Sequence, residues 1–470
     1  MSEGRAEIER MPTGVPNLDA ILGGGIPLYS VNLICGAPGS GKTVLTHQVL
    51  FKNATDERKA LYITTLSEPT IKVVRYQQQF SYFDPEAVGR RVFLADIGEE
   101  LRAHGLEGAM RRILDLVREH RPALVAIDSF KAIHDLAPSP QDHRRFVYEL
   151  AVRMAGWRCT TLLVGEYARE QIAKEPEFAV ADGVIWLEQV SSPEGPRRFV
   201  EVVKMRGTSF LPGRHSLRIT SDGIEVYPRV PPLKEPEGEE EELVRTGLDE
   251  VDEILGGGLP RGGCILVSGE AGTGKTILSL QFLWNGAVRF GERGLMFLYE
   301  EPLDQVLRMA GNFGWDFTRL EREGLCRIIP ESVVDLDIDR HIFEVGRFLS
   351  ETGAKRVVFD SISALLHPFS DRPGLIFEKL AQMVRMVKAH GATALFVSRV
   401  PSGERGLSRF GAEESLCDGI IVLRIREEGH KRRRTFEVYK LRTSAHVMGE
   451  HRMIIGPQGI EVLYALRTEE

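Results

Sequence analysis

Two segments of the chain combine glycines, a lysine and a hydroxyl side chain at a spacing suited to phosphate groups. They are GAPGSGKT (36–43) and GEAGTGKT (269–276), and both fit the pattern GxxxxGK[ST]. Glycines let backbone N–H groups close around phosphate oxygens, and a following helix adds its positive N-terminal end. Each segment follows a short apolar run and precedes a helical one. The sequence therefore predicts two nucleotide-binding sites.

Each loop supplies a cation for phosphate and a hydroxyl for a metal ion. We predict that Lys42 and Lys275 reach the β- and γ-phosphates of a nucleotide, and that Thr43 and Thr276 bind Mg²⁺. The predicted nucleotide-binding residues are Gly36, Ala37, Pro38, Gly39, Ser40, Gly41, Lys42 and Thr43 in the first loop, and Gly269, Glu270, Ala271, Gly272, Thr273, Gly274, Lys275 and Thr276 in the second.

An acid at the end of a buried strand is the second half of such a site. The runs ALVAIDSF (123–130) and RVVFDSIS (356–363) each supply one, as Asp128 and Asp360. We predict that both bind Mg²⁺ together with the loop threonines. The histidines are dispersed, and none forms a pair at metal-ligand spacing near acids or cysteines.

Adjacent carboxylates in GLMFLYEEPL (294–303) are candidates for orienting the water that attacks the terminal phosphate. Glu300 and Glu301 are predicted to end the strand after the second nucleotide-binding helix. Neighbouring residues on an extended chain point in opposite directions, so one of them is expected to contact the water. In the matching stretch LYITTLSEPT (61–70), Ser67 replaces the first glutamate and Glu68 retains the second. Either Glu68 takes over the role, or the first site turns nucleotide over more slowly.

An internal repeat places these residues in two domains. MPTGVPNLDAILGGG (11–25) matches VRTGLDEVDEILGGG (244–258), and 233 positions separate Lys42 from Lys275. Asp128 and Asp360 are 232 positions apart. A long, constant period indicates tandem domains. We predict domains at residues 1–232 and 244–470, joined by a linker at 233–243 that is rich in proline and glutamate.

Within each copy, short apolar runs alternate with longer amphipathic ones. The runs at 31–36, 60–65, 91–96, 123–128 and 160–165 are typical of buried strands, and residues 106–120 have helical spacing. This alternation predicts an α/β fold, in which a mainly parallel sheet has helices on both faces. The tighter spacing after GVIWLEQV (183–190) predicts antiparallel strands at the edge of the sheet.

Composition narrows the class of protein. The net charge of −7 over 470 residues argues against a protein that coats nucleic acid or an anionic membrane. The charged N-terminus does not have the apolar core of a signal peptide, and no apolar run approaches the length of a membrane span. The five cysteines are scattered and predicted to be buried, reduced thiols. We therefore expect a cytoplasmic protein.

The motifs together resemble the KaiC family of double-domain RecA-like ATPases. The resemblance rests on TG…LD.ILGGG before each phosphate loop, on the EE.P strand and on the paired strands that end in Asp-Ser. It implies a RecA-like P-loop fold in both domains, with ATP and Mg²⁺ bound in each. Glu300 matches the family's principal catalytic glutamate in the second domain, and Ser67 departs from that pattern in the first.

The resemblance also implies assembly into a homohexamer. VVKMRGTSF (202–210) and VYKLRTSAH (438–446) are similar to family hairpins whose basic residues reach the nucleotide of the neighbouring subunit. It thus gives a catalytic role in trans to Lys204 and Arg206, and to Lys440 and Arg442. The family's clock protein phosphorylates a Ser-Thr pair that falls here on Glu414 and Ser415. Labelling of Ser415 by serine/threonine autokinase activity is therefore an expectation.

Three function classes follow from these features. The first is a KaiC-like ATPase and autokinase in signalling or regulation, with an unidentified protein partner. The second is a RecA- or RadA-like nucleic-acid-dependent ATPase, which the acidic balance disfavours. The third is an ATP-gated assembly scaffold with little turnover. The basic run Lys431–Arg434 is expected to be a solvated hairpin tip, because no aromatic residue is interleaved with it.

Overall fold

The chain forms two compact units, Met1–Arg229 and Val230–Glu470. The computed structural model describes residues 8–65, 70–192, 195–229, 242–333, 336–401, 406–442 and 445–464. The predicted linker at 233–243 lies outside the described residues except for its last two positions, and Leu243 already begins strand β12. Among the described helices, none is both long enough and apolar enough to cross a membrane.

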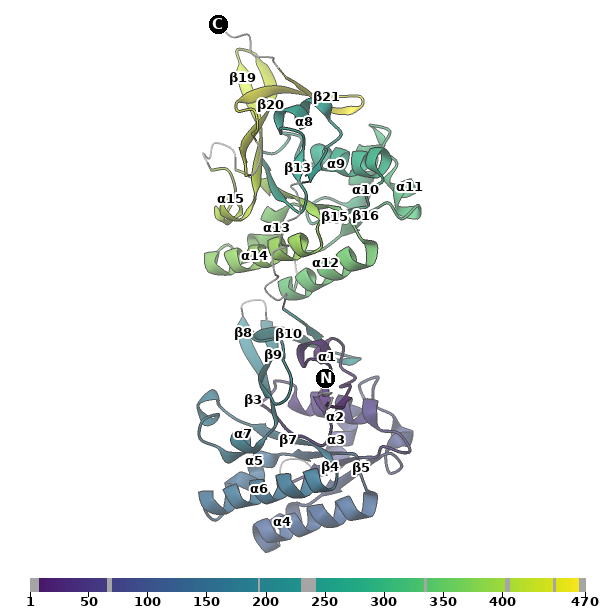
Figure 1. Cartoon of the computed structure of the whole chain (residues 1–470), viewed down its shortest axis with the longest axis vertical. Coiled ribbons are helices and arrows are strands. Elements are labelled where there is room, and N and C mark those ends of the chain that lie inside the picture. The colour runs from purple at the N-terminus through teal and green to yellow at the C-terminus, as the bar shows by residue number, and fades with distance from the viewer. Residues whose placement is uncertain are drawn as a thin grey trace, which may run out of the picture. The chain divides into compact units, whose positions relative to one another are not determined.

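The first unit is built on a mixed nine-stranded sheet with the order β11-β10-β9-β8-β3-β7-β6-β4-β5 (Figure 1). The strands from β8 to β5 in this order are parallel, and β8 to β11 form antiparallel hairpins. A two-stranded sheet precedes it. The strands are β1 (Arg10–Met11), β2 (Ile26–Pro27), β3 (Val31–Gly36), β4 (Ala60–Thr64), β5 (Val92–Asp96), β6 (Leu124–Asp128), β7 (Thr160–Glu166), β8 (Gly183–Ser192), β9 (Gly195–Met205), β10 (Arg214–Thr220) and β11 (Gly223–Tyr227).

The second unit repeats this design with the order β16-β15-β17-β18-β14-β19-β20-β21-β22. Its parallel strands again lie on one side and its antiparallel hairpins on the other. Both sheets therefore have the predicted α/β, RecA-like architecture. The strands are β12 (Leu243–Val244), β13 (Leu259–Pro260), β14 (Cys264–Gly269), β15 (Gly294–Leu298), β16 (Cys326–Pro330), β17 (Arg356–Asp360), β18 (Thr393–Arg399), β19 (Gly419–Glu428), β20 (Lys431–Leu441), β21 (Glu450–Gly456) and β22 (Gly459–Leu463).

Helices cover both faces of each sheet, because the buried strands are apolar on both sides. The helices of the first unit are α1 (Leu18–Ile21), α2 (Lys42–Asn53), α3 (Thr70–Gln77), α4 (Gly98–His120), α5 (Phe130–Asp135), α6 (Pro140–Gly156) and α7 (Pro176–Val180). Those of the second are α8 (Asp249–Ile254), α9 (Lys275–Phe290), α10 (Leu303–Gly311), α11 (Phe317–Arg322), α12 (Ile338–Thr352), α13 (Ile362–Leu366), α14 (Pro373–Ala389) and α15 (Ala412–Leu416).

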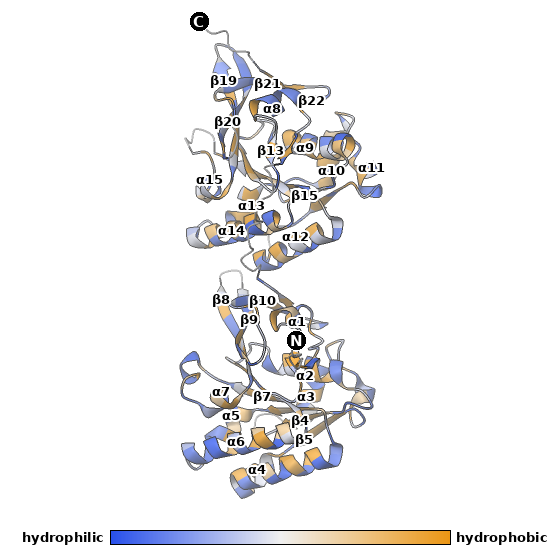
Figure 2. Cartoon of the chain, in the orientation of Figure 1, coloured by the Kyte–Doolittle hydropathy of each residue, from blue (hydrophilic) through white to orange (hydrophobic). Residues whose placement is uncertain are grey.

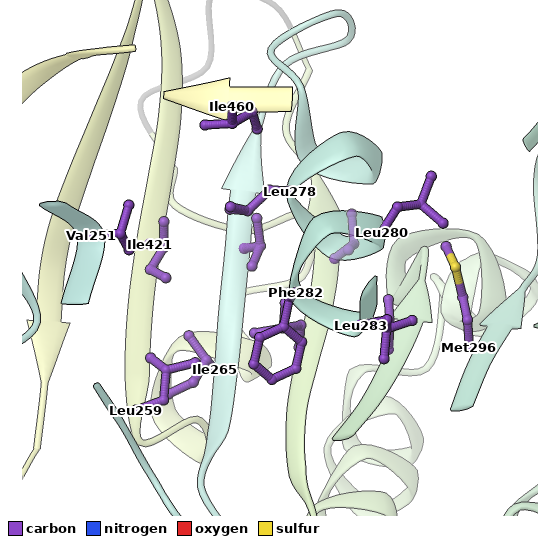
Figure 3. Packing of buried hydrophobic residues seen from close by; sticks show 14 of the residues in the cluster. Val251, Leu259, Ile265, Leu278, Leu280, Phe282, Leu283, Met296, Ile421 and Ile460 are labelled. Carbon is purple, nitrogen blue, oxygen red and sulfur yellow. The ribbon is translucent and has the colours of Figure 1, made fainter. Parts of the chain in front are cut away.

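Each sheet separates two hydrophobic cores. In the second unit, Val358 of β17 packs into the core beside α9, whereas its neighbours Val357 and Phe359 pack into the core beside α12 and α14. The long surface helices carry hydrophobic and hydrophilic residues side by side, as amphipathic helices must (Figure 2). Helix α9 packs against one face of the sheet through Leu278, Leu280 and Leu283 (Figure 3). This packing fixes where the helix begins, and so where the phosphate loop lies.

Candidate functional site

Both phosphate loops lie where the sequence predicts, between a central strand and a helix. Strand β3 ends at Gly36 and α2 begins at Lys42, while β14 ends at Gly269 and α9 begins at Lys275. The residue before each helix is a glycine with a left-handed φ, 104° at Gly41 and 107° at Gly274. That backbone turns the first N–H groups of the helix toward the loop, where they are available to an anion.

The loop lysines contact the loop backbone. Lys42 Nζ donates a hydrogen bond to the carbonyl of Ala37 at 2.9 Å. Lys275 Nζ donates to the carbonyls of Gly269 at 2.8 Å and Glu270 at 2.7 Å. Burial lowers the pKa of Lys275 to about 8, although the charge of Asp360 works against this shift. Anionic phosphate near this ammonium would favour its charged form.

The predicted metal ligands of the first domain lie together. Thr43 Oγ1 donates to Asp128 Oδ2 at 3.0 Å, and the Tyr62 hydroxyl donates to the same oxygen at 2.8 Å. A cation on this oxygen would compete with two hydrogen-bond donors.

The second domain differs at this point. Burial raises the pKa of the Asp360 carboxyl, the Thr276 hydroxyl acts against this shift, and the carboxylate oxygen Oδ2 has no hydrogen-bond partner among the described residues. The strand pairings place Met296 where the first domain has Tyr62, so the second donor is missing. A buried carboxylate oxygen without a partner beside a threonine hydroxyl fits the ligand set of Mg²⁺.

Glu300 and Glu301 lie near this carboxylate. Strand β15 ends at Leu298, so the two glutamates lie in the bend after the strand. The prediction that they end the strand is therefore wrong. Glu300 is exposed and Glu301 is half-buried. Burial raises the pKa of Asp360 to about 6, and the charges of Glu301 and Glu300 act in the same direction. The bend thus brings carboxylates to the metal side of the loop.

The matching residues of the first domain, Ser67 and Glu68, lie outside the described residues. The strand ends before them are nevertheless informative. The backbone N–H of Thr65 donates to the backbone carbonyl of Asp128, and the N–H of Tyr299 donates to the backbone carbonyl of Asp360. Glu300 directly follows Tyr299, whereas Leu66 directly follows Thr65. Three residues separate Thr65 from Pro69, whereas two separate Tyr299 from Pro302, so the first domain has one additional residue between its strand and the shared proline.

The two basic pairs do not contact the phosphate loop of their own domain through any described hydrogen bond. Lys204 Nζ donates to the carbonyls of Phe178 and Ala179 at the end of α7. Lys440 Nζ likewise donates to the carbonyls of Glu414 and Cys417, at the end of α15.

The arginine of each basic pair contacts the same helix end as its lysine. Arg206 donates to Asp182 and Ala179, and Arg442 donates to the carbonyl of Ser415 at 3.4 Å. Each pair therefore covers the carbonyl end of a short helix.

Ser415 lies on that same helix, α15. Its side chain is exposed, and Oγ donates to the carbonyl of Ala412 at 2.9 Å. Because of the contact with Arg442, this serine belongs to the surface formed by the second basic pair.

Sequence reasoning missed two arginines that contact the phosphate loops. Arg198 Nε donates to the carbonyl of Gly39 at 3.1 Å, and Arg434 Nε donates to that of Gly272 at 3.2 Å. Arg434 belongs to the run Lys431–Arg434, so the expectation of a wholly solvated hairpin tip is wrong for this residue. The internal repeat could have revealed these two arginines, because 236 positions separate Arg198 from Arg434 and the same number separates Lys204 from Lys440.

A second pair of charged residues was also missed. Glu166 ends β7 and Arg399 ends β18, each beside the last residue of the strand that leads into the phosphate loop. Glu166 Oε1 lies 3.6 Å from Lys42 Nζ. These residues are spaced by 233, but their opposite charges hide the correspondence in the sequence.

Comparison with known proteins agrees with this geometry. A family model described as the KaiC ATPase matches residues 11–230 and 244–467, nearly the whole chain. The chain belongs to the KaiC ATPase family. The circadian clock oscillator protein KaiC of Thermostichus vulcanus is 28% identical over 481 residues, which cover 100% of this chain and 92% of that protein. The circadian clock protein KaiC3 of a Synechocystis strain is 29% identical over 468 residues, covering 97% and 92%.

Proposed function

We propose that this KaiC-family chain is a regulatory ATPase that binds ATP and Mg²⁺ in both domains and hydrolyses ATP mainly in the second. The observation that carries this proposal is the Asp360 oxygen without a hydrogen-bond partner, next to Thr276 and near two glutamates. Thr276 and Asp360 would hold Mg²⁺. The bound ion supplies positive charge to phosphate oxygens.

The protein's own groups would hold the phosphates and orient the attacking water. Lys275 and the N-terminus of α9 hold the phosphates in place, since both present donors to the loop. Glu300 or Glu301 orients the attacking water and accepts its proton. Glu300 matches the glutamate that the family resemblance marks as catalytic, and we assign it this role, with Glu301 as its support.

We assign the first domain to nucleotide binding and slow turnover, with Glu68 as its acid. Two features support this assignment. Asp128 Oδ2 already accepts hydrogen bonds from Thr43 and Tyr62, and Lys42 already lies beside Glu166. ATP bound here would then serve assembly more than chemistry, as in a nucleotide-gated scaffold.

We further propose that copies of the chain form a ring, a hexamer as in the family, in which the basic pairs act in trans. Lys204 and Arg206, like Lys440 and Arg442, contact the ends of α7 and α15 rather than their own loops through the described bonds. Cations held on this surface are available to a nucleotide on a neighbouring subunit. A downstream protein partner would read the state of the ring. All five cysteines are buried and free, which supports a cytoplasmic location.

Ser415 is the proposed autophosphorylation site. Its exposed hydroxyl lies on the surface of the second basic pair, so a neighbour's ATP that reached Arg442 would also approach this serine. The adjacent Glu414 places a carboxyl group next to this serine.

The test is phosphate release and protein labelling with γ-labelled ATP, using wild type and the matched variants Lys42→Ala and Lys275→Ala. We expect Lys275→Ala to abolish most turnover and Lys42→Ala to retain it while weakening assembly. Turnover lost in Lys42→Ala with the ring intact would refute the assignment of catalysis to the second domain. Repeating the assay with single-stranded DNA tests the alternative of a nucleic-acid-dependent ATPase, which requires stimulation that salt weakens.

A further inference from the structure

One structural position carries opposite charges in the two nucleotide sites. Glu166 is paired in parallel register with Gly36, the first residue of the first phosphate loop. Arg399 is paired in the same register with Gly269, the first residue of the second loop. Both are the exposed last residues of otherwise buried strands, so backbone pairing fixes their place while the side chain is free to differ.

In the first domain the acid faces the phosphate-binding lysine. Glu166 Oε1 lies 3.6 Å from Lys42 Nζ, and the Glu166 side chain is 55% exposed. Ion pairs this exposed contribute little to stability. Their consequence here is electrostatic, because the lysine charge that phosphate would use is already partly balanced by a carboxylate.

In the second domain Arg399 occupies the strand position that Glu166 has in the first. The backbone N–H of Arg399 donates to Ser363 Oγ at 3.1 Å, which anchors the end of the strand. The strand register places Arg399 beside the first residue of the loop that contains Lys275. Two cations therefore lie at one loop, where the first domain has a cation and an anion.

We propose that this position sets the preference of each site between nucleoside triphosphate and diphosphate. Arg399 strengthens binding of the triphosphate in the second domain, and Glu166 weakens it in the first. The physical reason is the additional negative charge of the terminal phosphate, which is attracted by the arginine and repelled by the glutamate. The inference rests on the proposed function only in that both loops bind nucleotide.

Binding in the full-length chain tests this without relying on hydrolysis. Lys42→Ala silences the first site, so that the second can be titrated alone with Mg²⁺ and either ADP or the non-hydrolysable β,γ-imido triphosphate. We expect Arg399→Gln to weaken binding of the triphosphate analogue about 10-fold, the effect of removing one nearby charge, and to leave ADP affinity within about twofold. Arg399→Lys, which keeps the charge, is the matched control and should retain most of the preference.

The first site is read in the Lys275→Ala background. There Glu166→Gln should strengthen binding of the triphosphate analogue about 10-fold with ADP little changed, and Glu166→Asp should behave like the parent. Equal changes for both nucleotides, or no change in either site, would overturn the proposal. Absence of nucleotide binding in a parent variant would instead refute the proposed function at that site, so the two failures are distinguishable. Circular dichroism of each variant checks that it is folded.

Discussion

Replacing His47 with leucine should stabilise the first domain, and more strongly at acid pH. His47 lies on α2 and is fully buried against Tyr62, with ring centroids 4.1 Å apart. Neither ring nitrogen has a hydrogen-bond partner among the described residues. The second domain has Leu280 and Met296 at the corresponding positions, both in its hydrophobic core (Figure 3). The substitution therefore installs a residue that the same fold already accommodates.

Two contributions determine how much His47→Leu stabilises the first domain. A buried polar group without a partner costs about 1–3 kcal/mol, independent of pH while the ring is neutral. Burial also lowers the pKa of His47 from 6.5 to about 3. Between these values the unfolded chain binds a proton that the folded chain does not, so stability falls as pH falls. This linkage amounts to about 2 kcal/mol at pH 5 and to about 0.2 kcal/mol at pH 7.

Hydrogen exchange of peptides from α2 in the full-length chain measures this locally, which avoids treating a two-domain chain as two-state. At pH 5, His47→Leu should slow exchange about 25-fold more, relative to wild type, than it does at pH 7. The reverse substitution, Leu280→His, should destabilise the second domain with the same pH dependence. A stabilisation that is the same at both pH values would show that the imidazole is not held neutral, and would refute the reasoning.

Four further outcomes can be measured. In a phosphate-release assay, Glu300→Gln should lower turnover about 10²-fold or more, and Glu301→Gln should have the smaller effect; the opposite order would exchange their roles. Ser415→Ala should remove the label that γ-labelled ATP leaves on the protein, and label retained would place the phosphosite elsewhere. Arg434→Gln should weaken nucleotide binding to the second domain by loosening its loop, measured by titration in the Lys42→Ala background. Tyr62→Phe should strengthen Mg²⁺-dependent binding to the first domain, since it removes one of the two donors that compete for Asp128 Oδ2; unchanged Mg²⁺ dependence would contradict this reading.

Much of the fold and part of the site could be predicted from local sequence patterns. The phosphate loops and the strands ending at Asp128 and Asp360 were predictable because each is a short segment whose function depends on its own residue types and spacing. The antiparallel hairpins were predictable for the same reason, from closely spaced apolar runs.

Features that depend on strand pairing were not predictable. The correspondence of Glu166 with Arg399, and of Tyr62 with Met296, appears only when each strand is placed beside its neighbour. Sequence alignment through the shared proline also concealed the additional residue that follows Thr65, because a gap inside a short motif leaves no trace in residue types.

Two differences between the domains, the exchange of Glu166 for Arg399 and the additional residue after Thr65, fall at the carboxyl ends of parallel strands, and physical constraints explain why changes are tolerated there. Inside the sheet, side chains are buried on both faces, so a change of charge or size there costs stability. The last residue of a strand keeps its backbone hydrogen bonds while its side chain reaches solvent, so glutamate and arginine are tolerated equally. The same edge is where parallel strands deliver their residues to a bound nucleotide. A duplicated domain can therefore change how it handles nucleotide without altering the packing that holds its phosphate loop.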